Sequence, residues 1–203
     1  MAKKPQRHHY ETSLDANLIS LAFSVLVFGL VMFYFVVLHD RPFDLPFSER
    51  AFAIASVFLI GFSYLLGPLA RFSKFFASKL QYRKPFGLYG YAFAITHILL
   101  ALLVASPDVL AENGLSLFFG MIAIVIFSFV AATSMVSSIE AFGFDRWQKI
   151  QRMGYFAFLL VIIHFVVLEN GAFINRQLGQ ATLVFAGLVV LARVVTLLFK
   201  KSR

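Results

Sequence analysis

The sequence contains no cysteine and few charged residues. Of its 203 residues, 18 are Lys or Arg and 10 are Asp or Glu, so only 14% are charged, against about 25% in soluble domains. Without cysteine the chain forms no disulfide, no thiolate-ligated iron–sulfur cluster, no covalently attached c-type haem and no dithiol redox centre. The scarcity of charge excludes a soluble globular enzyme and a disordered chain.

Apolar residues make up 60% of the chain, and 26 of them are phenylalanine. A membrane-spanning helix needs about 20 predominantly apolar residues, and six segments approach that length. The sequence therefore predicts an all-α fold, a six-helix transmembrane bundle, with residues 1–14 as a tail and residues 15–203 as the membrane domain. The expected spans are Leu18–Leu38, Arg50–Leu69, Pro85–Ala105, Leu115–Met135, Arg152–Leu168 and Ala181–Phe199.

The positions of the basic residues predict the orientation of the bundle. Fourteen of the 18 Lys and Arg residues lie in the tail, the second–third loop, the fourth–fifth loop and the C-terminus, while Arg41, Arg50 and Arg176 lie in the opposite loops. Lys and Arg are retained on the cytoplasmic side, so we expect both termini to be cytoplasmic and the protein to be a multi-pass protein of the cell membrane, the inner membrane in a bacterium. This topology explains the net charge of +8 without a nucleic-acid partner. The opposite face is expected to be acidic, from Asp40, Asp44, Glu49, Asp108, Glu112 and Glu169.

Two histidines are predicted at matching depths within the bundle. His97 lies twelve residues beyond Pro85, and His164 lies twelve residues beyond Arg152, which places both about 18 Å from the cytoplasmic boundary. Ionisable residues inside a span are costly and often functional. Two imidazoles fill both axial positions of a b-type haem, whereas zinc takes three or four protein ligands. The alternative is that each histidine makes only one hydrogen bond inside the bundle.

Small residues accompany both histidines at helical spacing. Gly87, Gly90, Ala94 and Ala101 share a stripe with His97, and Gly154, Ala157 and Val161 share one with His164. Such stripes let a flat macrocycle approach the backbone, and they equally let two helices pack closely. The pattern alone leaves both explanations open.

Residues 83–93 with His97, and the set Thr133, Ser134, Trp147, Arg152, Tyr155 and His164, together resemble the ferric reductase-like transmembrane domain family. The resemblance covers residues 65–170. Within that family, the size and layout are most similar to the haem-binding membrane subunit of the methionine sulfoxide reductase system. It implies a six-helix bundle with b-type haem between the third and fifth helices, electron transfer across the membrane, and His97 and His164 as ligands of the outer haem.

The chain departs from the family pattern where an inner haem would be held. The family usually has a further histidine where this chain has Gln151, and the inner third-helix ligand falls near Arg83. Neither side chain is a good axial ligand, so the departure predicts one haem per chain. Gln151 can instead hydrogen-bond a quinone, a flavin or a propionate, or cap the fifth helix. Arg83 can contact a quinone or serve as a positive-inside residue. Arg193, inside the sixth span, can pair with a propionate or reach the interface.

These observations predict a haem b-binding electron-transfer subunit rather than a stand-alone enzyme. His97 and His164 would bind the iron, and Arg83, Gln151 and Arg193 would contribute to cofactor binding. Because no Gly-rich nucleotide motif follows a strand, we expect the electrons to come from a quinol or a cytoplasmic flavoprotein and to pass to ferric iron or a periplasmic or extracellular reductase. The alternative is a non-redox membrane protein, a transporter subunit or assembly factor, on a similar scaffold without haem.

Overall fold

The computed structural model describes residues 13–168 and 175–199 of the chain, and this part consists of helices and connecting turns without a strand. The basic residues of the N-terminal tail and the C-terminus, and Glu169, lie outside the described residues. Six helices are long and apolar enough to cross a membrane, which confirms the all-α six-span prediction. They are α1 (Leu14–Val36), α2 (Leu45–Leu69), α4 (Arg83–Val104), α6 (Gly114–Ala132), α8 (Phe144–Val167) and α9 (Gln177–Leu198).

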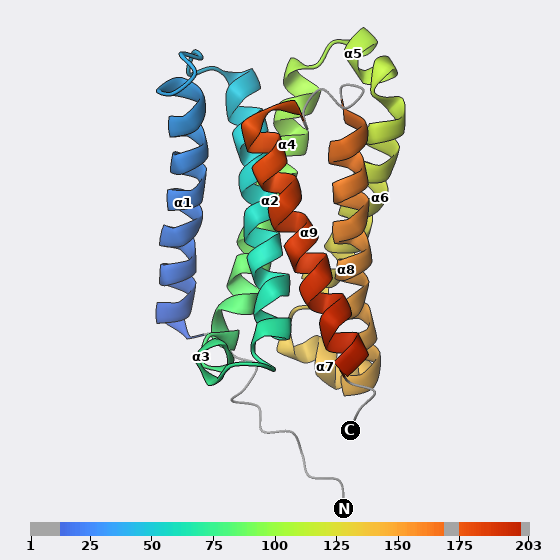
Figure 1. Cartoon of the computed structure of the whole chain (residues 1–203). Coiled ribbons are helices and arrows are strands. Elements are labelled where there is room, and N and C mark those ends of the chain that lie inside the picture. The colour runs from blue at the N-terminus through green and yellow to red at the C-terminus, as the bar shows by residue number, and fades with distance from the viewer. Residues whose placement is uncertain (1–12, 169–174, 200–203) are drawn as a thin grey trace, which may run out of the picture.

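The short helices divide between the two ends of the bundle. The helices α3 (Lys74–Ala77) and α7 (Val136–Phe142) lie at the end where α1 begins and α9 finishes, and α5 (Pro107–Glu112) lies at the other (Figure 1). The first end carries Arg71, Lys74 and Lys149, so we name it the inner end by the positive-inside rule and the α5 end the outer end. The two ends of the described chain therefore lie on one side, as the sequence predicts.

All six spanning helices begin earlier than their hydropathy predicts, and α2 and α8 do so by the most residues. The helix α2 begins at Leu45 rather than Arg50, because Asp44 Oδ1 accepts a hydrogen bond from the amide of Phe47 at 3.0 Å and caps the helix. The helix α8 begins at Phe144 rather than Arg152. The first two turns of α8 are polar, so a hydropathy criterion places the start of the span after the helix has already begun. Because α2 begins at Leu45, Glu49 lies inside this helix instead of in an outer loop.

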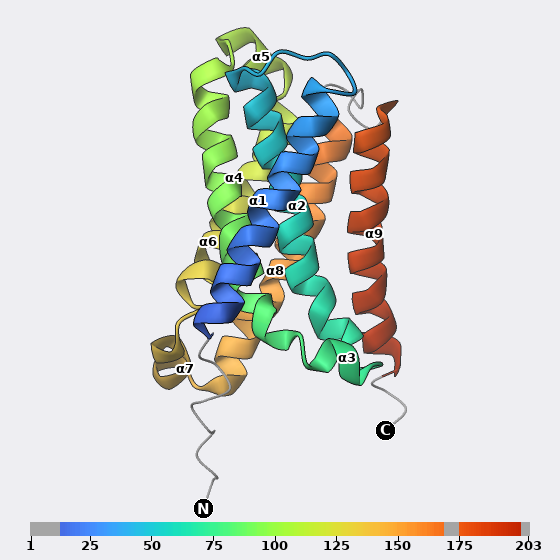
Figure 2. The same ribbon diagram turned by 90° about the vertical axis from the view of Figure 1, so that its left-hand side faces the viewer.

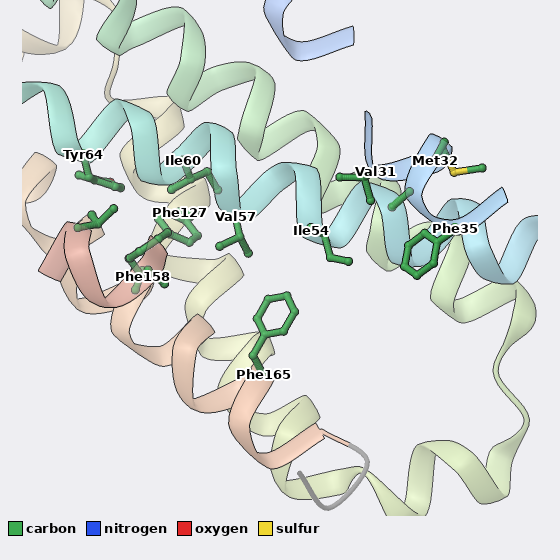
Figure 3. Close-up of a cluster of buried hydrophobic side chains, with 14 residues drawn as sticks. Val31, Met32, Phe35, Ile54, Val57, Ile60, Tyr64, Phe127, Phe158 and Phe165 are labelled. Carbon is green, nitrogen blue, oxygen red and sulfur yellow. The ribbon is translucent and has the colours of Figure 1, made fainter. Parts of the chain in front are cut away.

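The helix α2 is the centre of the bundle. It packs against α4 on one side and α9 on the other, and Figure 2 shows α9 on the opposite side of the bundle from α4 and α6. Side chains of α2 point into the cluster of buried residues in Figure 3, where Tyr64, Ile60 and Val57 meet Phe127 of α6 and Phe158 of α8. The second close helix pair is α6 with α8.

Glycines determine how closely α4 and α8 approach α2. A Cβ at Gly90 would lie 2.9 Å from the backbone nitrogen of Ile60, and one at Gly87 would lie 3.1 Å from Ser63 Oγ. A Cβ at Gly154 would overlap the hydroxyl of Tyr64. The glycines of both stripes therefore serve close helix packing, which decides between the two explanations that the sequence leaves open for these three positions.

Candidate functional site: a histidine pair and a basic cavity

His97 faces the beginning of α2. Its Nδ1 lies 2.6 Å from Glu49 Oε1, and the two side chains are 23% and 14% exposed. The atoms meet at ion-pair distance, but the ring nitrogen makes no well-aligned hydrogen bond with the carboxylate. Glu49 is thus largely buried beside an imidazole, and its assignment to an acidic outer face is wrong. The cap at Asp44, which starts α2 a full turn before Glu49, is the physical reason.

His164 faces the beginning of α6. Its Nδ1 lies 2.9 Å from the carbonyl oxygen of Ser116 and 2.9 Å from that residue's Oγ. The hydroxyl of Ser116 also lies 3.0 Å from the carbonyl oxygen of His164. Gly120, one turn further along α6, leaves room for the ring, since a Cβ there would lie 3.1 Å from Nδ1. These contacts hold the imidazole in one orientation.

The two imidazoles share one arrangement. Each has Nδ1 turned to a partner on a neighbouring helix, Glu49 for His97 and Ser116 for His164. Among the described residues, neither Nε2 atom has a hydrogen-bond partner. Histidines that bind metals characteristically engage the other ring nitrogen with a carboxylate or a backbone carbonyl, which fixes the tautomer and leaves the remaining nitrogen to the metal. The donor set therefore fits two axial ligands.

The pair lies closer to the outer end than a twelve-residue count predicts. His97 stands seven residues before the end of α4, and His164 stands in the last turn of α8. These separations correspond to about 10 Å and 5 Å along the helices, and α4 reaches farther toward the outer end than α8 (Figure 2). Glu49 and Ser116 lie within the first two turns of helices that begin at this end, so both rings belong to the outer part of the bundle.

The pair can bind a metal ion only with the help of further donors. Within the described residues, no three His, Cys, Asp or Glu side chains form a group that could hold a metal ion. A porphyrin brings four equatorial nitrogens and needs only two axial ligands from the protein. The residues present therefore fit haem better than a bare metal ion.

A second feature lies near the inner end. A cavity of about 820 Å³ opens between α2, α4, α6, α8 and α9, and Arg83, Gln151 and Arg193 all line it. The structure thus brings together the three residues singled out in the sequence besides the histidines, but at a different level of the bundle. Thirteen residues of α8 separate Gln151 from His164, which is about 20 Å along the helix.

Each of the three residues has a defined position in this cavity. Gln151 Nε2 donates to the carbonyl oxygen of Val130 at 3.1 Å and to Thr133 Oγ1 at 3.2 Å, so it ties α8 to the C-terminal end of α6 instead of capping its own helix. Arg193 places its guanidinium carbon 4.8 Å from the ring centre of Tyr155. Arg83 begins α4, and its side chain lies against Gly67 of α2.

Sequence reasoning missed the partners that make these sites. Glu49 and Ser116 hold the histidines, while Arg71, Arg152 and Trp147 complete the cavity. The sequence draws attention to Glu49 only as an outer acidic residue, and to Trp147 and Arg152 through the family resemblance. Helix orientation brings these groups together, and the sequence does not report it directly.

Comparison with known protein families and with curated proteins returns no match to this chain.

Proposed function

We propose that the chain is a haem b-binding membrane subunit that carries electrons toward an acceptor on its outer side. The observation that supports this most directly is the pair of imidazoles at the outer end. His164 Nδ1 lies at hydrogen-bond distance from Ser116, His97 Nδ1 lies at ion-pair distance from Glu49, and neither Nε2 has a hydrogen-bond partner among the described residues. A bound haem would supply a one-electron redox centre there. The resemblance to ferric reductase-like domains agrees with this proposal.

The residues around the pair would set the properties of the ligands. The carboxylate of Glu49 beside His97 Nδ1 favours electron donation from that ring, and the carbonyl oxygen of Ser116 accepts the Nδ1 proton of His164. Burial among apolar helices limits solvent access, which is a further influence on redox potential. Two differently supported imidazoles would therefore share one iron.

Electrons would enter from the inner side. Gln151 at the inner end lies about 20 Å from His164 along α8, and Tyr155, which also lines the cavity, still lies nine residues, or about 14 Å, before His164. A single haem at the outer end therefore needs a donor that reaches into the bundle. We propose a quinol or a cytoplasmic flavoprotein in that role. The acceptor would be ferric iron or an extracytoplasmic reductase that docks at the outer end.

One observation favours the alternative of a non-redox membrane protein. Both histidines already make interhelical contacts, His97 with α2 and His164 with α6, and such contacts are sufficient reason for a histidine inside a bundle. On this alternative, removal of either imidazole weakens packing and changes no spectrum.

The test is the reduced-minus-oxidised absorption spectrum of protein purified from haem-replete cells. We expect b-type bands at about one haem per chain, and we expect His97→Ala and His164→Ala each to lose them because each removes one axial ligand. His39→Ala is the matched control, since His39 is an exposed histidine after α1 that packs on Tyr34. Absence of bands in the folded wild-type protein, or full haem retention in both ligand variants, would contradict the proposal.

A further inference from the structure

The inner cavity concentrates positive charge. Five basic side chains from α4, α8, α9 and the segment after α2 line it: Arg71, Arg83, Lys84, Arg152 and Arg193. No Asp or Glu is among the described residues that line the cavity. A positive-inside bias explains basic residues in loops. It does not explain why side chains from separate helices converge on one space between the helices.

Within residues 13–168 and 175–199, the partners found for three of these cations are neutral. Arg71 Nη1 donates to the carbonyl oxygen of Thr196 at 3.3 Å, and Arg152 Nη2 donates to Gln148 Oε1. Arg193 stacks on Tyr155 and lies within range of the charges of Arg71, Arg83 and Arg152. Like charges gathered at a low-dielectric boundary repel one another, so an anion in the cavity would relieve an unfavourable arrangement.

The other end of the cavity is apolar. It continues from the arginines toward the middle of the bundle, where Ile60, Leu88, Phe127 and Val130 line it. The step along α4 from Arg83 to Tyr91, which also lines the cavity, covers about 12 Å. A ligand that matches both parts has an anionic head at the inner end and an apolar body directed toward the membrane centre.

We propose that this cavity binds the phosphate head group of an anionic phospholipid. Arg side chains bind phosphate oxygens in a bidentate manner, and basic pockets between spanning helices on the cytoplasmic side are a recurring form of lipid head-group site. A neutral quinone would leave five cations uncompensated, so the charge favours the phosphate ester. This site is independent of the histidine pair, which lies at the outer end.

The chain carries a direct reporter for this site. Its single tryptophan, Trp147, lines the cavity and donates from Nε1 to the carbonyl oxygen of Thr133 at 2.9 Å. Brominated phosphatidylglycerol added to the full-length protein in neutral detergent should quench this fluorescence at lower concentrations than brominated phosphatidylcholine. Unbrominated phosphatidylglycerol should reverse the quenching, whereas inorganic phosphate, which lacks the apolar body, should not.

Charge variants connect the effect to the cavity. Arg83→Gln and Arg193→Gln should each weaken the phosphatidylglycerol effect about fivefold, as expected for one basic residue near a lipid surface. Lys149→Gln is the matched control, because Lys149 is an exposed basic residue of α8 outside the cavity, and it should retain the wild-type preference.

Three results would overturn the proposal. Equal quenching of the wild-type protein by the two lipids would exclude head-group selection, and this measurement needs no variant to fold. Reversal by inorganic phosphate alone would assign the cavity to a soluble anion. Two haems per chain by pyridine haemochrome, with one lost in Arg83→Gln, would assign it to a porphyrin. The first two of these results do not depend on whether His97 and His164 bind haem.

Discussion

Replacing Gly90 by Ala tests the close packing of α2 and α4 that positions His97. Gly90 is buried on the face of α4 that meets α2, and its absent side chain lets the two backbones approach. A Cβ there would lie 2.9 Å from Ile60 N, 2.7 Å from Ile60 Cγ1 and 3.1 Å from Leu59 Cβ. Ordinary contacts of a Cβ begin at 3.4 Å, so Gly90→Ala forces α4 away from α2.

The size of the effect follows from which atom blocks the methyl group. A side chain such as that of Ile60 can change rotamer, but a backbone nitrogen inside a spanning helix moves only with the helix. Overpacking of this kind costs about 1–3 kcal/mol. Gly→Ala also gains about 1 kcal/mol of helix propensity, and Gly29→Ala shares that gain, because a Cβ at Gly29 in α1 would meet nothing within 4 Å. The difference between the two variants isolates the packing term.

The assay is unfolding by sodium dodecyl sulfate in mixed micelles, followed by Trp147 fluorescence. We expect Gly90→Ala to be less stable than Gly29→Ala by about 1–3 kcal/mol. His97 lies seven residues, or two turns, beyond Gly90 on the face that meets α2. The same displacement should therefore separate His97 from Glu49. Equal stability of the two variants would refute the close approach of α2 and α4.

Two further predictions concern the ends of the bundle. Asp44→Ala should lower the free energy of unfolding by about 1 kcal/mol, because it removes the acceptor for the Phe47 amide that starts α2; Asp44→Asn, which keeps an acceptor, should be close to wild type in the same detergent titration. Because the chain contains no cysteine, a single Lys79→Cys or Asp108→Cys can be labelled without background: an impermeant maleimide applied to intact cells should modify Asp108→Cys alone, and labelling of Lys79→Cys from outside would reverse the orientation.

Hydropathy predicts the spans well and their polar ends poorly. All six helices are recognisable from their apolar runs because the cost of burying polar groups in lipid requires such runs. The beginning of α8 is not recognisable, since residues such as Asp145 and Lys149 extend the helix into the aqueous side. The beginning of α2 was available from Asp44 followed by Pro46 in the first helical turn, although the apolar run alone begins at Arg50.

The partners of each site residue depend on helix rotation, which the sequence does not report directly. Spacing places Gly90 and His97 on one face of α4, and that inference holds, but it does not say that the face meets α2. The convergence of Arg83, Gln151 and Arg193 is unpredictable for the same reason. Three helices must turn the correct faces to one space before these residues become neighbours.

The separation of the two sites constrains any function that joins them. His164 lies about 20 Å along α8 from Gln151 at the inner end of the cavity, and about 14 Å from Tyr155, the cavity residue of α8 nearest to it. Between Tyr155 and His164, the side chains of Ala157, Phe158 and Leu160 are buried in the core. Side chains therefore pack this middle section of α8. A ligand in the cavity can influence the histidines only through helix packing or through a bound group that itself extends between the two levels.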